Sequence, residues 1–139
     1  MIGIIIVTHG DFGSYLLEAC EHIVGRKDKI RSVSIYPKMT MDDIRKTIKK
    51  VTDEMRSECS SLVYLVDIPG GTPMNVVIPF AKEIEKSYVV CGLNMNMLID
   101  AMILRERLDP DHFVDKIISD ARRSICEVSE IFSSLNDKK

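Results

Sequence analysis

Two short segments of this 139-residue chain carry residue types that transfer protons or chemical groups. His9 follows an apolar run within Thr8-His9-Gly10, and Asp67 ends a second apolar run. A carboxylate that accepts a hydrogen bond from Nδ1–H fixes the tautomer of an imidazole and leaves a lone pair on Nε2. The two residues therefore predict a histidine that acts as a nucleophile or a general base. An orienting hydrogen bond without any chemistry is the alternative interpretation.

A glycine-rich turn follows Asp67 and leads into an amphipathic segment. It reads Gly70-Gly71-Thr72-Pro73, in which Pro73 suits the first position of a helix and Thr72 suits the N-cap. Amides at a helix N-terminus bind anions, which predicts a phosphate site at Gly70, Gly71 and Thr72. Without a following lysine the turn is not a Walker A loop, and taken alone it is a plain capped turn. Beside a histidine nucleophile it predicts phosphoryl transfer, because that reaction uses both parts.

The positions of these residues depend on an alternation of short β-branched runs with longer amphipathic segments. We expect strands over residues 2–7, 33–36, 61–67 and 88–91. We expect helices over residues 16–24, 40–55, 73–85 and 97–107, and from 113 onward. This alternation predicts an α/β fold with a three-layer, doubly wound and mainly parallel sheet. For its strand order we expect 2-1-3-4, the common order in small domains of this kind. The pattern leaves an additional antiparallel edge strand open.

That strand order makes the first and third strands neighbours. Neighbouring strands lie about 4.7–4.9 Å apart, and ligands bind outside the carboxyl ends of such strands where the order reverses. His9 and Asp67 are therefore expected to meet at that edge. Phe12 follows closely and, if exposed, would help a partner to dock. Asn94 comes after the fourth strand, where it would either touch a ligand or turn the chain.

Composition excludes one large class of partners. The 19 Lys and Arg residues against 21 Asp and Glu residues give a net charge of −2, and 6% of the residues are aromatic. A nucleic-acid-binding protein would carry basic patches or aromatic platforms, so we expect no nucleic-acid partner. His22 and His112 fit surface or helix-capping positions, and we assign them no role.

The cysteines and the apolar N-terminal run predict a reduced, cytoplasmic protein. The four cysteines form no Cys-x-x-Cys pair and have no histidine at zinc-ligand spacing. We therefore expect neither a metal site nor a redox dithiol. The apolar run over residues 1–7 is far shorter than the roughly 20 residues of a membrane-spanning helix, which favours a cytoplasmic location.

Taken together, these motifs resemble the enzyme IIA component of the mannose class of the bacterial phosphoenolpyruvate-dependent sugar phosphotransferase system. The resemblance covers essentially the whole chain and rests on three motifs in the same order. These are residues 4–7 running into Thr8-His9-Gly10, Val66-Asp67 followed by Gly70-Gly71-Thr72-Pro73 and Asn75, and Gly92 and Asn94 followed by Met97-Leu98. The resemblance implies a single domain of that class over residues 1–139, typically as a homodimer.

The resemblance also assigns roles to the residues at the predicted edge. The histidine that matches His9 accepts a phosphoryl group from the histidine phosphocarrier protein and passes it to a separate IIB component, for coupled sugar uptake and phosphorylation. Asp67 matches the residue that orients this histidine, and the hydroxyl and amides that match Thr72 lie beside the phosphate. The IIC and IID membrane subunits would be reached indirectly, from a position peripheral to the transport complex. No cofactor is implied.

Several positions depart from the family pattern. Pro69 stands where family members often carry an aromatic or other bulky residue, and Met74 stands where Phe is usual. Because these positions surround the site, we predict that Phe12, Pro69, Met74 and Asn94 contact partner proteins. Residues 118–132 lack glycine and resemble a continuing helix, which argues against a C-terminal strand exchanged between subunits.

Two other functions fit the same residues. A flavodoxin-like regulatory or binding module would sense a small phosphorylated ligand at the same edge without transferring the phosphoryl group. Tight binding of a flavin or a nucleotide would favour that module. A donor subunit of a dihydroxyacetone kinase would use His9 as a carrier within a different system.

Overall fold

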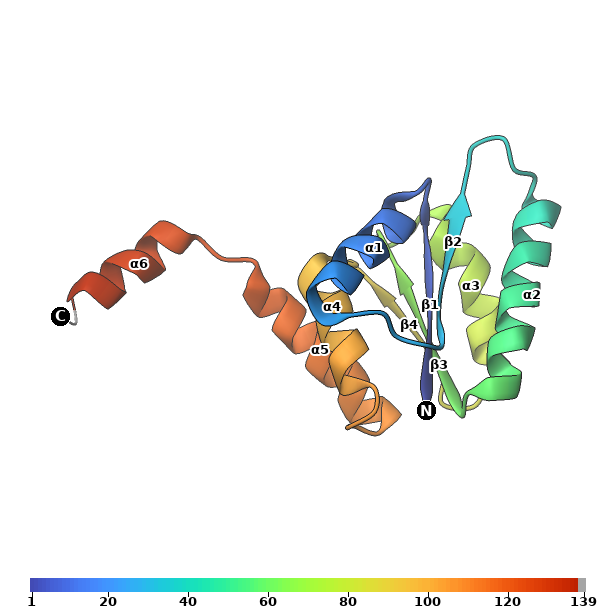
Figure 1. The fold of residues 1–139 in the computed structure, drawn as a ribbon. Coiled ribbons are helices and arrows are strands. Elements are labelled where there is room, and N and C mark those ends of the chain that lie inside the picture. Colours follow the sequence, from blue (N-terminus) through green and yellow to red (C-terminus); the bar gives the residue numbers. More distant parts are fainter. Residues whose placement is uncertain (138–139) are drawn as a thin grey trace.

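Strands alternate with helices along the chain, as the sequence predicts (Figure 1). The computed structural model describes residues 1–137, and four strands and six helices lie within them. The strands are β1 (Ile2–His9), β2 (Ile30–Ile35), β3 (Ser61–Val66) and β4 (Tyr88–Cys91). The helices are α1 (Phe12–Val24), α2 (Met41–Glu58), α3 (Thr72–Lys82), α4 (Met95–Leu104), α5 (Pro110–Ser124) and α6 (Val128–Asp137).

All four strands are parallel and lie in the order β2-β1-β3-β4, which confirms the predicted sheet. β1 is paired on both sides, so that Ile4 lies opposite Ile30 of β2 and Val63 of β3. Within residues 1–137 no antiparallel strand extends either edge of the sheet. The optional fifth strand is therefore absent from the described part of the chain.

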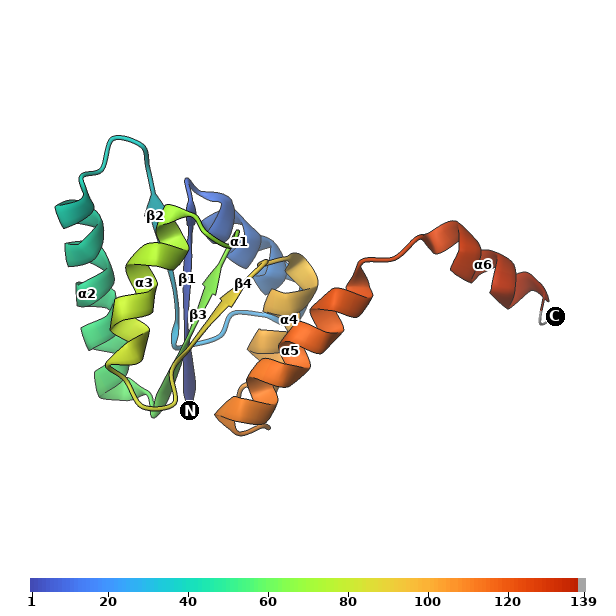
Figure 2. The same cartoon turned by 180° about the vertical axis from the view of Figure 1, so that it is seen from behind.

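Helices cover both faces of the sheet. α1, α4 and α5 lie on one face, and α2 and α3 lie on the other (Figures 1 and 2). Successive residues of β1 therefore pack into different cores. Ile4 and Ile6 belong to the core that includes Phe113, whereas Ile5 belongs to the core that includes Ile48. Burial on both faces explains why β1 is a continuous apolar run rather than an alternating one.

Local sequence signals determine where α2 begins and where α1 ends. Asp43 N–H donates to Thr40 Oγ1 at 3.1 Å, and Thr40 N–H donates to Asp43 Oδ2 at 3.3 Å. This reciprocal pair is a capping box at the start of α2. Gly25 ends α1 with φ of 85°, a left-handed conformation that favours glycine.

Several elements differ from their predicted bounds by a few residues; α1, for example, begins at Phe12 rather than at residue 16. β2 begins at Ile30, three residues earlier than expected. The prediction missed this start because Arg31 and Ser32 are polar, which is compatible with a strand at the edge of the sheet. The helix expected to continue over residues 118–132 is interrupted after Ser124. The Glu127 carboxylate accepts hydrogen bonds from two amides in the first turn of α6, so that a new helix begins there. α6 points away from the sheet (Figures 1 and 2).

Candidate functional site

His9 and Asp67 meet at the carboxyl edge of the sheet. His9 is the last residue of β1 and Asp67 directly follows β3, so two neighbouring strands bring their side chains together. His9 Nδ1 lies 2.8 Å from Asp67 Oδ2, and the backbone N–H of His9 donates to the same oxygen at 2.9 Å. Because Nδ1 is engaged by the carboxylate, Nε2 is the ring nitrogen left free to react.

Several N–H donors keep the Asp67 carboxylate ionised. Partial burial would raise the pKa of Asp67, whose side chain is only 12% exposed. Hydrogen bonds from the His9 backbone, the His9 ring and the Ile68 backbone outweigh burial, so the pKa of Asp67 lies below its usual range. An ionised carboxylate in this position stabilises positive charge on the imidazole when Nε2 forms a new bond.

The Thr8 hydroxyl organises the turn that follows His9. Thr8 is fully buried, and its Oγ1 accepts a hydrogen bond from Gly13 N–H at 2.8 Å. The same hydroxyl donates to the carbonyl oxygen of Gly10 at 3.3 Å. Gly10 N–H in turn donates to the carbonyl oxygen of Ile35 at 2.7 Å. These bonds tie the start of α1 and the end of β2 to the strand end that carries the histidine.

Gly70 and Gly71 lead the chain from β3 past the imidazole into α3. Gly70 has φ of 80°, which favours glycine. A Cβ on Gly71 would lie 3.0 Å from His9 Cε1, so the backbone passes close to the ring. The predicted N-cap at Thr72 is wrong, because Gly71 takes the extended conformation of the cap and Thr72 is already the first helical residue. The first amides of α3, which have no acceptor within the helix, therefore begin beside His9.

The site combines the accessible His9 ring with the nearly buried Asp67 carboxylate and the N-terminus of α3. The His9 side chain is 50% exposed, so a reacting group can approach the ring from solvent. Positive charge that develops on the ring lies next to an ionised carboxylate, and negative charge on an incoming group lies next to the N-terminus of α3. This arrangement can accept an anionic group on Nε2 and hold it there.

An apolar cavity of about 480 Å³ opens beside His9 on the side of β2. Besides His9 and Thr72 it is lined by Gly10, Ile35, Tyr36, Pro37, Met39, Met41 and Ile44. Tyr36 donates a hydrogen bond from its hydroxyl to Asp11 Oδ1 across the rim of this cavity. No role was predicted for Tyr36, Pro37, Met39 or Met41, although Tyr36 is the last residue of a predicted strand and so belongs to the same edge.

The residues predicted to contact partners lie at different places around His9. Phe12 is 48% exposed at the start of α1, and Pro69 is exposed in the turn after β3. Met74 is half-buried, and its sulfur accepts a hydrogen bond from Gly70 N–H at 3.3 Å. Phe12, Pro69 and Met74 therefore belong to segments that adjoin the His–Asp pair.

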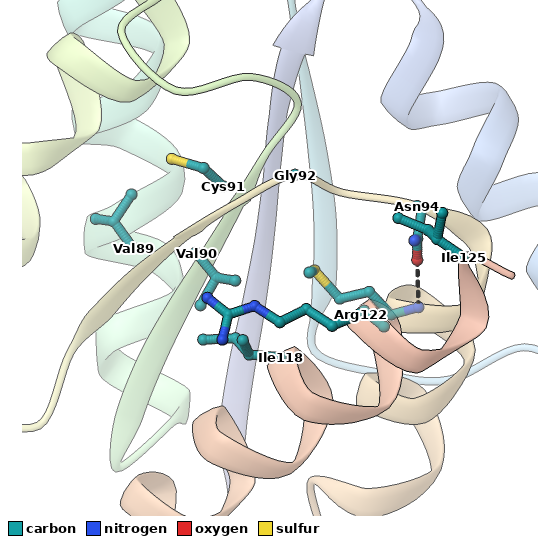
Figure 3. A pocket seen from close by; sticks show the side chains of 10 residues that line it. Val89, Val90, Cys91, Gly92, Asn94, Ile118, Arg122 and Ile125 are labelled. Carbon is teal, nitrogen blue, oxygen red and sulfur yellow. Dashed lines mark hydrogen bonds between the residues drawn. The ribbon is translucent and has the colours of Figure 1, made fainter.

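Asn94 has a structural task and faces a different cleft. Its Oδ1 caps α4 by accepting from Met97 N–H at 2.8 Å, and its Nδ2 donates to Ser124 Oγ at 3.4 Å. The cleft that it lines, of about 390 Å³, lies between β4 and α5. Figure 3 shows Arg122 extending along this cleft between Ile118 and the strand. The residues that line it include no histidine and no carboxylate, so it offers no acid–base pair.

Residues 1–137 contain neither a cluster of potential metal ligands nor a helix that could span a membrane. No group of three or more potential metal ligands gathers within that part of the chain. No helix there is both long enough and apolar enough to cross a bilayer. The four cysteines are free, and burial raises the pKa values of the Cys20, Cys59 and Cys91 thiols.

Comparison with known sequences gives consistent matches. Residues 3–118 match the family model EIIA-man, described as PTS system fructose IIA component. The fructose-specific EIIA component of Bacillus subtilis is 27% identical over 130 residues, which cover 94% of this chain and 88% of that protein. The mannose-specific EIIAB component of Escherichia coli K12 is 25% identical over 120 residues. That match covers 85% of this chain and only 35% of the E. coli protein.

Solved structures with the same fold agree with the sequence matches. The EIIA phosphotransferase component of Streptococcus agalactiae superposes with a TM-score of 0.84 at 31% identity, covering 94% of this chain and 99% of that one. The mannose/sorbose-specific IIA subunit of Enterococcus faecalis gives a TM-score of 0.81 at 21% identity, covering 90% and 92%. At that lower identity the second likeness concerns the fold alone.

Proposed function

Because this chain belongs to the EIIA-man family of PTS system fructose IIA components, whose members carry phosphoryl groups in sugar phosphotransferase systems, we propose that His9 is its phosphorylated residue. The observation that carries the proposal is the 2.8 Å hydrogen bond between His9 Nδ1 and Asp67 Oδ2 at the ends of β1 and β3. This bond supports a nucleophilic Nε2 and a carboxylate that stabilises the charged ring.

The proposed reaction moves a phosphoryl group from one histidine to another. Neutral His9 Nε2 attacks the phosphorus of a phosphohistidine on the donor protein, and a new N–P bond forms while the donor N–P bond breaks. The donor ring, which carries a proton on its other nitrogen, keeps the electron pair of the broken bond and leaves as a neutral imidazole. The positive charge of the donor phosphohistidine ring thereby passes to the His9 ring. Asp67 keeps Nδ1–H in place and balances this charge. Both end states are phosphohistidines, so positioning accounts for most of the rate.

The turn before α3 is the proposed phosphate site. The amides of Gly71 and Thr72 and the hydroxyl of Thr72 would hold the equatorial phosphoryl oxygens, and the Gly70 amide would join them by exchanging its hydrogen bond to Met74 Sδ for one to the phosphoryl group. The close approach of Gly71 to the imidazole supports this role, since a phosphoryl group on Nε2 would lie beside the N-terminus of α3. No metal ion and no organic cofactor takes part in the proposed step.

The proposed partners follow from the family. The donor is the histidine phosphocarrier protein, the acceptor is a separate IIB component, and the IIC and IID membrane subunits are reached through IIB. We further propose that residues 1–139 form one domain of the mannose class, of which 138–139 lie outside the described residues. It would act as a homodimer in the cytoplasm, peripheral to the transport complex. Phe12, Pro69 and Met74 would contact both partners, and Asn94 would hold the loop after β4.

One labelling experiment tests the carrier function. Wild-type protein and His9→Ala are incubated with phosphoenolpyruvate, enzyme I and the histidine phosphocarrier protein, and their intact masses are then measured. We expect one acid-labile phosphoryl group on the wild type and none on the variant. An unlabelled wild type, with a control IIA component labelled under the same conditions, would favour a binding module that does not transfer phosphoryl groups.

A further inference from the structure

We propose that Met74 is a positioning residue for phosphoryl transfer, whose sulfur holds the Gly70 amide while His9 is free and releases it once His9 is phosphorylated. Met74 would thereby set how far the transfer equilibrium lies toward the phosphorylated protein. The proposal rests on the proposed function of His9 and deepens it, because it names a residue that controls the stability of the phosphohistidine without contacting the phosphoryl group.

Two side chains from the first turn of α3 hold the peptide groups on either side of Gly70. Gly70 N–H donates to Met74 Sδ at 3.3 Å, and Asn75 Nδ2 donates to the carbonyl oxygen of Gly70 at 3.4 Å. Both bonds come from the chain itself and support the left-handed φ of 80° at Gly70. The turn is therefore formed before a phosphoryl group arrives, which lowers the ordering cost of holding one.

This turn runs beside the nitrogen that we propose to be phosphorylated. A Cβ on Gly71 would lie 3.0 Å from His9 Cε1 and 3.6 Å from His9 Nε2, and Gly70 directly precedes this residue. The space around Gly70 is open, since a Cβ at that position would meet no atom within 4 Å. The Gly70 amide therefore has room to turn from the sulfur toward an oxygen of a phosphoryl group on Nε2, and a glycine backbone permits the rotation.

The two acceptors that compete for the Gly70 amide differ in strength. A thioether sulfur is a weak acceptor, whereas hydrogen bonds to a charged oxygen are about twice as strong as bonds between neutral groups. The amide should therefore leave the sulfur only when a phosphoryl group is present. Met74 suits this exchange because its flexible, unbranched side chain is half-buried against the core that includes Ile48, where it can adopt another rotamer.

The exchange has a defined effect on the transfer equilibrium. The N–H···S bond stabilises only the free protein, so the free energy of breaking it opposes phosphorylation. Removal of the sulfur at nearly constant side-chain volume should therefore favour the phosphorylated form. A contact between Met74 and a partner protein would have no such effect, because docking changes the forward and reverse transfer rates alike and cancels in the equilibrium constant.

An equilibrium measurement tests the proposal. Wild type, Met74→Leu and Met95→Leu are each mixed with known amounts of phosphorylated and unphosphorylated histidine phosphocarrier protein, and the phosphorylated fraction is measured by intact mass once it is constant. Met95, which is 39% exposed at the start of α4, provides the matched control. Circular dichroism verifies that each variant is folded. In the wild type, NMR spectra follow the Gly70 amide proton before and after phosphorylation.

The proposal predicts a gain of phosphorylation rather than a loss. Met74→Leu should raise the equilibrium constant for transfer about 2–5-fold, the effect of one weak hydrogen bond, and Met95→Leu should leave it unchanged. The Gly70 amide proton should move downfield on phosphorylation, because a charged acceptor replaces a weak neutral one. A constant at or below that of the wild type in folded Met74→Leu, or an unmoved Gly70 signal, would overturn the exchange and leave the carrier function intact. A wild type that gains no phosphoryl group would overturn the proposed function as well.

Discussion

Residues 1–137 contain two histidine–aspartate pairs with similar geometry and different surroundings. His9 Nδ1 lies 2.8 Å from Asp67 Oδ2, and His112 Nδ1 lies 2.5 Å from Asp109 Oδ2. The second pair is local, because its residues are three positions apart at the start of α5. The first pair joins residues 58 positions apart and exists only because β1 and β3 are neighbours in the sheet.

The difference shows that a histidine–aspartate contact alone does not make a reactive site. Asp109 also accepts from the backbone N–H of His112, so that pair caps a helix on an open surface. Its two side chains are 77% and 57% exposed, whereas Asp67 is 12% exposed. Only the pair at the sheet edge combines a covered carboxylate with the N-terminus of a second helix and an apolar cavity.

The largest contrast between the two pairs is expected when each histidine is replaced in turn. His9→Ala should reduce phosphoryl labelling below detection, because the acceptor atom is lost. His112→Ala should be labelled at the wild-type rate, since its ring only faces the start of α5. Intact-mass measurements over time distinguish the two variants. Labelling of His9→Ala would show that a different residue is the acceptor.

Removal of each negative charge gives the next largest contrast. Asp67→Asn should slow labelling about 10–100-fold, because the neutral amide no longer fixes Nδ1–H or balances the charged ring. Asp109→Asn should leave the labelling rate unchanged. Rapid-quench measurement of the phosphorylation rate compares the variants, and equal rates for both would show that Asp67 has no orienting role.

A methyl group added at Gly71 tests how closely the backbone approaches the ring of the His9–Asp67 pair. Gly71 has φ of −84°, so alanine fits the backbone there, but its Cβ would lie 3.0 Å from His9 Cε1. Gly71→Ala should therefore slow labelling about 10-fold by displacing the ring, with little change in Tm. A large fall in Tm would instead mean that the fold, rather than the ring position, depends on this glycine.

The smallest effect concerns the pH dependence of the local pair. The hydrogen bond to Asp109 raises the pKa of His112 above its ordinary 6.5, and donors from His112 lower the pKa of Asp109 below its ordinary 3.8. The stabilisation from this pair is therefore lost as the pH rises through the raised value or falls through the lowered one. An NMR titration should show the His112 midpoint moving down in Asp109→Asn. An unmoved midpoint would contradict the pairing.

The sequence predicted the edge of the sheet better than the loops around it. β1 and β3 contain nearly continuous apolar runs because both of their faces are covered, so the polar residues His9 and Asp67 at the ends of these runs could be assigned to the sheet edge directly. The capping box at Thr40 and Asp43 involves residues three apart and needs no knowledge of the fold. The strand order is the common one for small doubly wound domains, and it brings the pair together.

Features that depend on the conformation of a turn or on distant contacts were missed. The cap of α3 lies at Gly71 because the preceding glycine turns the chain there, which residue preferences at Thr72 do not reveal. The break before α6 depends on one carboxylate, Glu127, that competes with continuation of the helix. The cavity wall at Tyr36 and Met41 forms only when β2 is aligned beside β1.

The central position of β1 in the sheet has a consequence for how the protein unfolds. Residues 4–7 are paired with strands on both sides and are fully buried, so their amides should exchange with deuterium only when the whole domain unfolds. The histidine lies in the same strand, two residues after this segment. Local opening of the peripheral helix α6 should therefore leave the reactive edge intact, and labelling should persist until global unfolding begins.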